Sequence, residues 1–242
     1  MRRSSNLIRT LGIVFFSAGI LVNLLFFALL TWPGIEAYDY FGYQPAGAAL
    51  TSLKCPYVLT THETGQVTVT YTNSSSLTLS PQFRVQVSTP DLLNRTVNTA
   101  ASIAPGETQE LHWAITSNDV VFGRMILVEV YVSPVYDTPD RMGQCGTLWV
   151  DAPQVTGMQV FTAVLAAGLL LTALGWGLWL ARYRPERASG LDVTHAMLAI
   201  TAIVLLGMVA GLLGWWVVGV ACLVLSLLLI IATLGHFIAP RA

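Results

Sequence analysis

The stretch "SIAPGETQELHWAI", Ser102–Ile115, combines a tight turn with an alternating strand. Pro105 presets one backbone dihedral of the turn, and Gly106 tolerates the positive φ that the next position requires. The residues that follow alternate in polarity, and the apolar ones are Leu111, Trp113 and Ile115. Because successive side chains of a strand point to opposite faces, these three share one face. Trp113 is therefore predicted to be a core residue.

The same period of two recurs on both sides of this strand, with turn signals such as "STPD" and "SNDVVFG" between the runs. The expected strands are Tyr57–Thr60, Gln66–Asn73, Gln82–Ser88, Val97–Ile103, Thr108–Ile115, Arg124–Val132 and Gly146–Val150. About seven short strands at such spacing predict an antiparallel β-sandwich of immunoglobulin type.

Two motifs in this segment resemble a known group of folds. "TGQVTVTYTN" (Thr64–Asn73) followed by "IAPGETQELHWAI" (Ile103–Ile115) resembles the bacterial adhesion-type and CARDB-like immunoglobulin folds, in which a "vtNtG"-like strand precedes a "lapGes…w" turn and strand. This chain departs from the pattern, because Asn73 is followed by Ser74 instead of glycine. The resemblance implies a fold, an extracytoplasmic location, and adhesion or protein binding as the usual use. A shared fold does not carry a function across.

The flanking segments are far more apolar. The chain is 54% hydrophobic and 10% charged, against about 25% charged residues in an ordinary soluble domain. Runs without charged residues cover Leu11–Trp32, Val160–Ala181 and Ala196–Ile238. The first two would form helices of about 33 Å, enough to cross a hydrocarbon core of about 30 Å, and the third would be about twice as long. The third run is expected to turn at "GLLGWW", Gly211–Trp216, which predicts four transmembrane helices in all.

Basic residues predict the orientation of these helices. They flank the apolar runs at Arg2, Arg3, Arg9, Arg182, Arg184, Arg187 and Arg241, opposed by Glu186 and Asp192. The positive-inside rule places these segments, and both termini, in the cytoplasm. The alternative for the first run is a cleaved signal peptide, although its apolar length of about 20 residues exceeds the usual 7 to 15.

The predicted organisation interrupts the membrane helices with one exterior domain. It comprises a cytoplasmic N-terminus (1–10), a first transmembrane helix (11–32), an extracytoplasmic sandwich domain with an aromatic lead-in (33–157), a second transmembrane helix (158–181), a cytoplasmic basic loop (182–194), third and fourth transmembrane helices (195–213 and 215–237), and a cytoplasmic C-terminus (238–242). The localisation is expected to be the plasma membrane. The preference for Arg over Lys favours a bacterial source.

Two of the cysteines are expected to pair. Cys55 precedes the first strand and Cys145 the last, and two thiols in an exported domain usually form a disulfide. A redox or metal pair is the alternative, although no second set of ligands accompanies them. Cys222 falls within an apolar run and is expected to serve in packing.

Recognisable chemistry is missing from the rest of the sequence. No catalytic residue, metal site or cofactor site is predicted, and we expect no enzyme. His195 and His236 could form a two-histidine metal site or merely cap two membrane helices. His62 lies beside Glu63, but successive residues point apart, so neither a zinc site nor an acid/base role is expected.

Small and polar residues indicate how the membrane helices pack. Gly207 and Gly211 form a GxxxG pair, with Ala163 and Ala167 as a weaker counterpart. Asn23 is expected to form a hydrogen bond between helices. No Asp, Glu, Lys or Arg lies inside a predicted span, whereas transporters and channels usually place ionisable groups there.

Two exposed segments are candidates for contact with other molecules. "AYDYFGYQP" (Ala37–Pro45) is interpreted either as an aromatic belt at the membrane surface or as a patch for a partner. "SPVYDTPDRMGQ" (Ser133–Gln144) is expected to be a long loop at the membrane-distal end of the sandwich, with Tyr136, Arg141 and Met142 as candidate partner contacts.

The leading functional hypothesis is a non-catalytic membrane protein. It would present its immunoglobulin-like domain outside the cell for protein binding or for the assembly of an envelope complex. The expected partners are membrane lipid and another envelope protein or a second copy of the chain, with neither nucleic acid nor a small-molecule ligand. The alternatives are a subunit of a transporter or channel and, less favoured by the residues, an enzyme.

Overall fold

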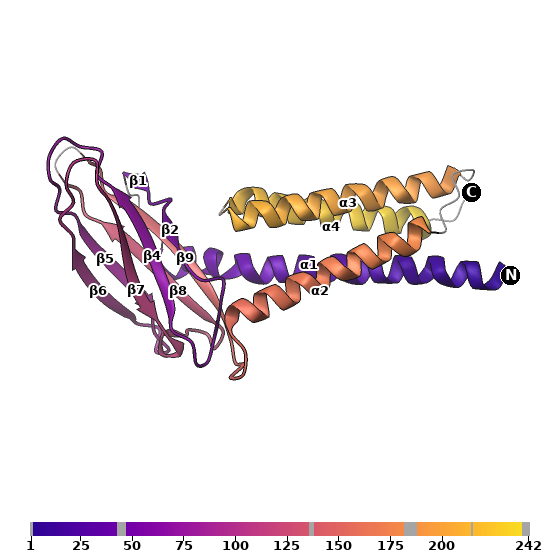
Figure 1. The fold of residues 1–242 in the computed structure, drawn as a ribbon, viewed down its shortest axis with the longest axis horizontal. Helices are drawn as coiled ribbons and strands as arrows, with labels where there is room; N and C mark the ends of the chain where they lie inside the picture. Colours follow the sequence, from indigo (N-terminus) through magenta and orange to yellow (C-terminus); the bar gives the residue numbers. More distant parts are fainter. Residues whose placement is uncertain (1, 43–46, 136–137, 182–187, 214, 239–242) are drawn as a thin grey trace. The chain divides into compact units, whose positions relative to one another are not determined.

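The structure is a computed structural model that describes residues 2–42, 47–135, 138–181, 188–213 and 215–238. The chain divides into two compact units. One comprises Met1–Thr31 with Thr162–Ala242 and is helical, and the other comprises Trp32–Phe161 and contains the strands (Figure 1).

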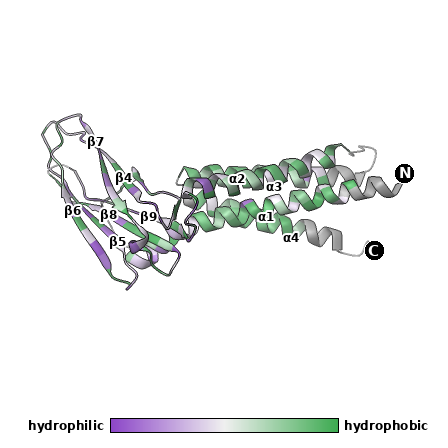
Figure 2. Ribbon diagram, turned by 60° about the horizontal axis from the view of Figure 1, so that its bottom comes forward, coloured by the Kyte–Doolittle hydropathy of each residue, from purple (hydrophilic) through white to green (hydrophobic). Residues whose placement is uncertain are grey.

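The helices are α1 (Arg2–Phe41), α2 (Gly157–Leu180), α3 (Ala188–Leu212) and α4 (Trp216–Ile238). Figure 2 shows that their described residues are mostly hydrophobic. By length and composition, three described segments could cross a membrane: Thr10–Phe41, Gly157–Leu180 and Val193–Leu212. The described apolar part of α4, Val217–Ala232, is shorter.

Helix α1 does not end at Trp32, where the sequence predicted its end. Pro33 lies inside the helix, although proline cannot donate the backbone hydrogen bond that an interior residue normally makes. The continuation is stabilised by packing, because Ala37 is fully buried in an apolar cluster with residues of the sheet. The helix stops at Gly42, whose φ of 77° is the left-handed conformation typical of a residue just past a helix end.

The strands lie between α1 and α2 in the chain. They are β1 (Ala48–Ala49), β2 (Leu53–Lys54), β3 (Val58–Thr60), β4 (Gly65–Thr72), β5 (Gln82–Ser88), β6 (Asn94–Ala100), β7 (Thr108–Ile115), β8 (Met125–Val132) and β9 (Arg141–Val150). The strands β5 and β7 have the predicted bounds. The short strands β1 and β2 were not predicted, and β9 begins five positions earlier than expected, at Arg141.

These strands form two sheets. One has the order β1-β9-β8-β5-β6, with β3 also paired to β9, and the other has the order β2-β4-β7. The chain crosses between the sheets from β4 to β5, from β6 to β7 and again from β7 to β8, which is the connectivity of an immunoglobulin-like sandwich. The predicted sandwich is therefore confirmed, with one difference. It is not wholly antiparallel, because β1 and β3 pair in parallel with β9.

The sandwich core contains alternate residues from both sheets. Trp113 lies in it as predicted, and its indole Nε1 donates a hydrogen bond of 3.0 Å to Thr99 Oγ1 of the opposite sheet. Phe83 is fully buried beside it. The alternation read from the sequence thus selects the core face of the strands correctly.

The two motifs that carried the resemblance meet in space. Gly106, with φ at 74°, donates its N–H to Asn73 O at 2.9 Å, and Asn73 N donates to Glu107 O at 2.9 Å. The Asn73 side chain is fully buried and donates to the carbonyls of Leu77 and Ile103. Asn73 therefore fastens the turn that follows β4 to the turn that precedes β7.

Candidate functional site

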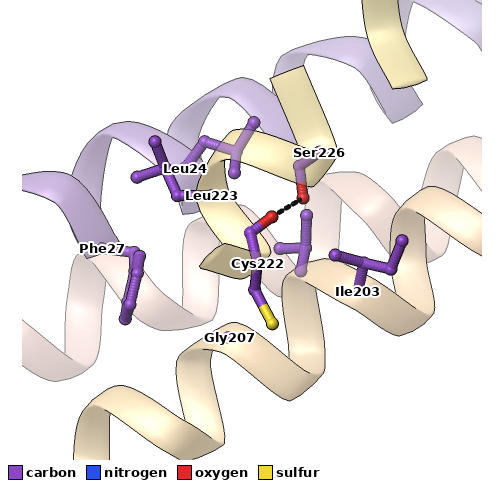
Figure 3. A pocket seen from close by; sticks show the side chains of 8 residues that line it. Leu24, Phe27, Ile203, Gly207, Cys222, Leu223 and Ser226 are labelled. Carbon is purple, nitrogen blue, oxygen red and sulfur yellow. Dashed lines mark hydrogen bonds between the residues drawn. The ribbon is translucent and has the colours of Figure 1, made fainter. Parts of the chain in front are cut away.

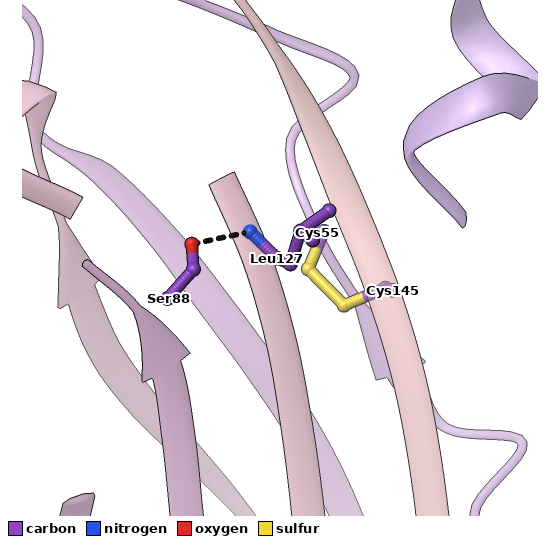
Figure 4. The surroundings of a disulfide bond; sticks show 4 residues. All are labelled: Cys55, Ser88, Leu127 and Cys145. Atoms are coloured by element: carbon purple, nitrogen blue, oxygen red, sulfur yellow. Dashed lines mark hydrogen bonds between the residues drawn. A yellow bond between two sulfur atoms is a disulfide. The ribbon is translucent and has the colours of Figure 1, made fainter. Parts of the chain in front are cut away.

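The predicted disulfide is confirmed. Cys55 and Cys145 are bonded, with 6.1 Å between their Cα atoms, and they tie the segment between β2 and β3 to β9 (Figure 4). Both cysteines pack against the sandwich core. Closing a loop of 90 residues stabilises the fold by about 4 to 5 kcal/mol in the chain-entropy model.

The sandwich also holds the first residue of α2. Glu63, in the turn between β3 and β4, accepts hydrogen bonds at Oε2 from Gly157 N (2.6 Å), Thr60 N (3.0 Å) and Thr60 Oγ1 (2.8 Å). Gly157 allows this approach, because a Cβ there would overlap the backbone carbonyl of Val58. Nearby, the rings of Tyr57 and Phe161 stack with centroids 5.4 Å apart.

This arrangement explains the charge state of Glu63. Burial raises its pKa, but the hydrogen bonds from Gly157 N–H and from Thr60 outweigh burial, and the pKa is lowered overall. A carboxylate at a helix N-terminus also satisfies a free N–H group and interacts favourably with the helix dipole. Glu63 therefore serves as a cap for α2, a role that the sequence could not reveal because its partner lies far along the chain.

Other candidates for chemistry stay apart in the structure. His62 and His112 are exposed, His195 is exposed on α3, and the side chain of His236 lies outside the described residues. Among the residues described, no group of three or more His, Cys, Asp or Glu side chains is placed to hold a metal ion.

The predicted contact loop is shorter than the sequence indicated. Arg141 and Met142 belong to β9, where they pair with Val132 and Tyr131 of β8, so the loop covers only 133–140. The guanidinium carbon of Arg141 lies over the ring of Tyr71, 5.3 Å from its centroid. Arg141 and Met142 are half-buried, and Tyr136 lies outside the described residues.

Part of the aromatic lead-in packs within the domain, a role that the sequence did not predict. Tyr40 and Phe41 pack in one cluster with Ala37. The cluster also contains Met125 and Leu127 of β8, and Val121, which precedes that strand. The residues 43–46 lie outside the described part of the chain. Tyr40 and Phe41 therefore serve in packing within the domain, whereas Tyr38 is exposed.

The helical unit contains a close contact between α1 and α2. Gly12 and Gly19 of α1 face Gly175 and Gly168 of α2, and a Cβ at Gly19, Gly168 or Gly175 would overlap atoms of the other helix. Asn23 is buried and donates from Nδ2 to Thr172 Oγ1 at 3.4 Å. The sequence identified Asn23 but missed these glycines, although each pair is spaced by one heptad.

Two glycines of α3 pack against other helices of the same chain. Gly207 packs against Cys222 of α4, and Gly211 against Phe27 of α1. Ala163 and Ala167 are exposed, so the weaker small-residue pair that the sequence indicated makes no close contact there. Two indole groups bond α2 to α3, from Trp176 Nε1 to Thr201 Oγ1 at 3.1 Å and from Trp179 Nε1 to Thr194 Oγ1 at 3.0 Å.

A small cavity lies between α1, α3 and α4 (Figure 3). Its volume of about 10 Å³ is room for roughly one water molecule. The lining is apolar except near Ser226, whose Oγ donates to Cys222 O at 2.8 Å. Because the Ser226 hydroxyl already donates to the helix backbone, this cavity offers little to a polar ligand.

Comparisons with known proteins do not assign the chain to a family. No family model matches the chain, and no curated protein does. A CARDB domain from Pyrococcus furiosus, solved in complex with di-metal ions, is 16% identical with a TM-score of 0.31, and the match covers 41% of this chain and 90% of that domain. A cycloisomaltooligosaccharide glucanotransferase from Paenibacillus is 13% identical with a TM-score of 0.34, covering 46% of this chain and 15% of the enzyme.

A third solved structure, β-glucuronidase 2 of Bacteroides uniformis, is 13% identical with a TM-score of 0.32, covering 40% of this chain and 12% of that enzyme. This chain therefore spans only a small part of either enzyme. Likeness at this level carries no activity across, and the sandwich is assigned from its own strand order.

Proposed function

We propose that the chain is an integral membrane protein that presents its sandwich outside the cytoplasm to bind another envelope protein. The observation that carries this proposal is the Cys55–Cys145 disulfide, in a domain that lies in sequence between helices long and apolar enough to cross a membrane. Disulfides persist in oxidising compartments and are rare in the cytosol. The proposed topology has four spans with both termini in the cytoplasm.

The topology is supported by the arginines that flank the apolar helices at Arg2, Arg3, Arg182 and Arg187. Reporter enzymes fused after Arg187 and after Arg241 are expected to be active in the cytoplasm, and a fusion after Asn118 is expected to be active outside. Cytoplasmic activity at Asn118 would contradict the proposed orientation.

Binding is proposed for the sandwich end that lies away from Gly157. This end carries the turn that ends in Glu107, the loop with exposed Leu77, and the loop 133–140. Chain segments between strands tolerate variation and often provide binding residues on a rigid scaffold. The disulfide and the Asn73 contacts supply that rigidity here.

The test replaces Val135–Pro139 with a Gly/Ser linker of equal length. Asp140 is kept, because its carboxylate accepts from Gly47 N at 2.8 Å and its carbonyl accepts from Ala48 N at 3.0 Å. Arg141 is kept because of its contact with Tyr71. The variant is expected to fold and to form the disulfide but to lose proteins that co-purify from native membranes.

The matched control changes exposed residues on the outer face of β7, Glu110→Ser with His112→Ser. This control is expected to retain the co-purifying proteins. If the loop replacement retains every one of them as well, the proposed binding surface is wrong.

A further inference from the structure

One end of the sandwich carries large apolar side chains in exposed turns. Leu92 and Leu93, between β5 and β6, are 59% and 66% exposed, and Phe122, between β7 and β8, is 49% exposed. Leu92 and Phe122 also have positive φ values of 63° and 54°. Glycine or asparagine usually occupies such positions, so a leucine and a phenylalanine there add backbone strain to the cost of exposing apolar surface.

These turns lie at the end of the sandwich from which α2 begins. Trp149 N, near the end of β9, donates to Arg124 O at 2.8 Å, and Ser88 Oγ, at the end of β5, donates to Asp119 O at 2.8 Å. Strand β9 then leads within a few residues to Gly157, which Glu63 holds at this same end. The apolar turns and the first turn of α2 therefore share one end of the domain.

Tyr40, near the end of α1, contacts both turns. Its hydroxyl donates to Leu93 O at 2.9 Å, and its ring meets that of Phe122 edge-on with centroids 6.3 Å apart. Both turns are thus fastened to the end of α1.

We propose that Leu92, Leu93 and Phe122 insert into the outer interface of the phospholipid bilayer. This inference rests on the proposed membrane crossing of α2, because a crossing helix that begins at this end brings lipid to the same end. Exposed Arg124, beside Phe122, is available to lipid phosphates. The opposing charge in the other turn is Asp91, whose pKa is lowered by the neighbouring Thr89 side chain.

The experiment places a fluorophore at single cysteines in a Cys222→Ala background. Cys55 and Cys145 are bonded to each other and do not react. The test positions are Leu93→Cys and Phe122→Cys. The matched control is Leu77→Cys, at a leucine whose exposed fraction (54%) lies between those of Phe122 and Leu93, at the opposite end of the sandwich. Leu170→Cys, exposed on α2, reports the membrane crossing.

The labelled full-length proteins are reconstituted in vesicles of phosphatidylcholine and phosphatidylglycerol that contain doxyl lipids, and iodide is the aqueous quencher. Labels at Leu93 and Phe122 are expected to be quenched strongly by doxyl groups near the headgroups and weakly by iodide, with the reverse at Leu77. The label at Leu170 is expected to be quenched by doxyl groups deep in the acyl chains.

If deep doxyl groups quench the Leu170 label, the membrane crossing of α2 holds, and either of two results at the turns would then overturn the inference. Strong quenching of the Leu93 and Phe122 labels by iodide would show that the turns face water. Protection from both quenchers would show that protein covers them. If lipid fails to quench the Leu170 label, the proposed crossing of α2 is wrong and the inference falls with it.

Discussion

Helix α1 packs in two different ways along its length. Between Gly12 and Asn23 it meets α2 through glycines that leave no room for a Cβ, whereas near Ala37 it meets the sheet through apolar side chains. Lipid chains are as apolar as leucine, so membrane helices gain from close backbone approach and hydrogen bonds more than from apolar burial. In water, burial itself stabilises contact, by about 25 cal/mol per Å² of apolar surface. Small residues therefore mark where α1 approaches α2 most closely, whereas buried apolar side chains mark its contact with the sheet.

The largest effect is expected in the sandwich core. Phe83→Ala removes a fully buried ring that contacts Tyr71 and Trp113, at centroid distances of 5.7 and 6.1 Å. We expect the free energy of unfolding of the sandwich to fall by about 3 to 5 kcal/mol. Denaturant unfolding of the purified protein measures it. Leu77→Ala, at an exposed leucine, is the control, and similar losses in the two variants would contradict apolar burial as the main stabilising effect.

In the helical unit, enlarging a glycine is expected to matter more than removing a polar group. Gly175→Leu drives a side chain into Phe16 of α1, including its backbone, and is expected to cost about 1 to 3 kcal/mol. Gly177→Leu is the matched control on the same helix, because no atom lies within 4 Å of a Cβ there. Thermal unfolding in detergent compares them, and equal melting temperatures would show that the α1–α2 contact is not close.

A smaller effect is expected from the polar contact between these helices. In a double-mutant cycle of Asn23→Ala and Thr172→Ala, we expect a coupling energy of about 0.6 kcal/mol for the hydrogen bond between the two side chains. The same unfolding assay measures the coupling. A coupling energy of zero would leave the glycines as the main determinant of this contact.

An effect of similar size is expected where the sandwich caps α2. Because the folded pKa of Glu63 is lowered, its stabilising effect is fully present above the ordinary value of 4.5 and is lost as the pH falls through the folded pKa. Glu63→Gln is therefore expected to lower the free energy of unfolding by about 0.3 to 1 kcal/mol near neutral pH. The difference from the unmutated protein should shrink in acid. A difference that grows as the pH falls would contradict the capping role.

Much of the sandwich could be predicted because its strands alternate locally. The bounds of β5 and β7, the core position of Trp113 and the pairing of Cys55 with Cys145 all follow from local pattern and placement. The early part of β9, "RMGQC", lacks such alternation, and its strand is formed by pairing with β8 and β1.

The parts that the sequence did not reveal depend on distant residues. The passage of α1 through Pro33 is stabilised by burial of Ala37 against Val121 and Leu127, and local propensity gives no sign of that contact. The capping of Gly157 by Glu63 joins residues far apart in the chain. The heptad spacing of the glycines in α1 and α2 was a readable signal of close helix packing.

We propose that the chain holds a disulfide-closed domain outside the cytoplasm, and this proposal depends above all on the state of the cysteines in native membranes. The chain has 3 cysteines, of which Cys222 is free. Membranes are denatured without reductant and treated with a maleimide polymer. Each free thiol that reacts lowers the electrophoretic mobility of the chain by one step. We expect one adduct, at Cys222, and modification of all 3 cysteines only after reduction. Modification of all 3 cysteines without reductant would contradict it.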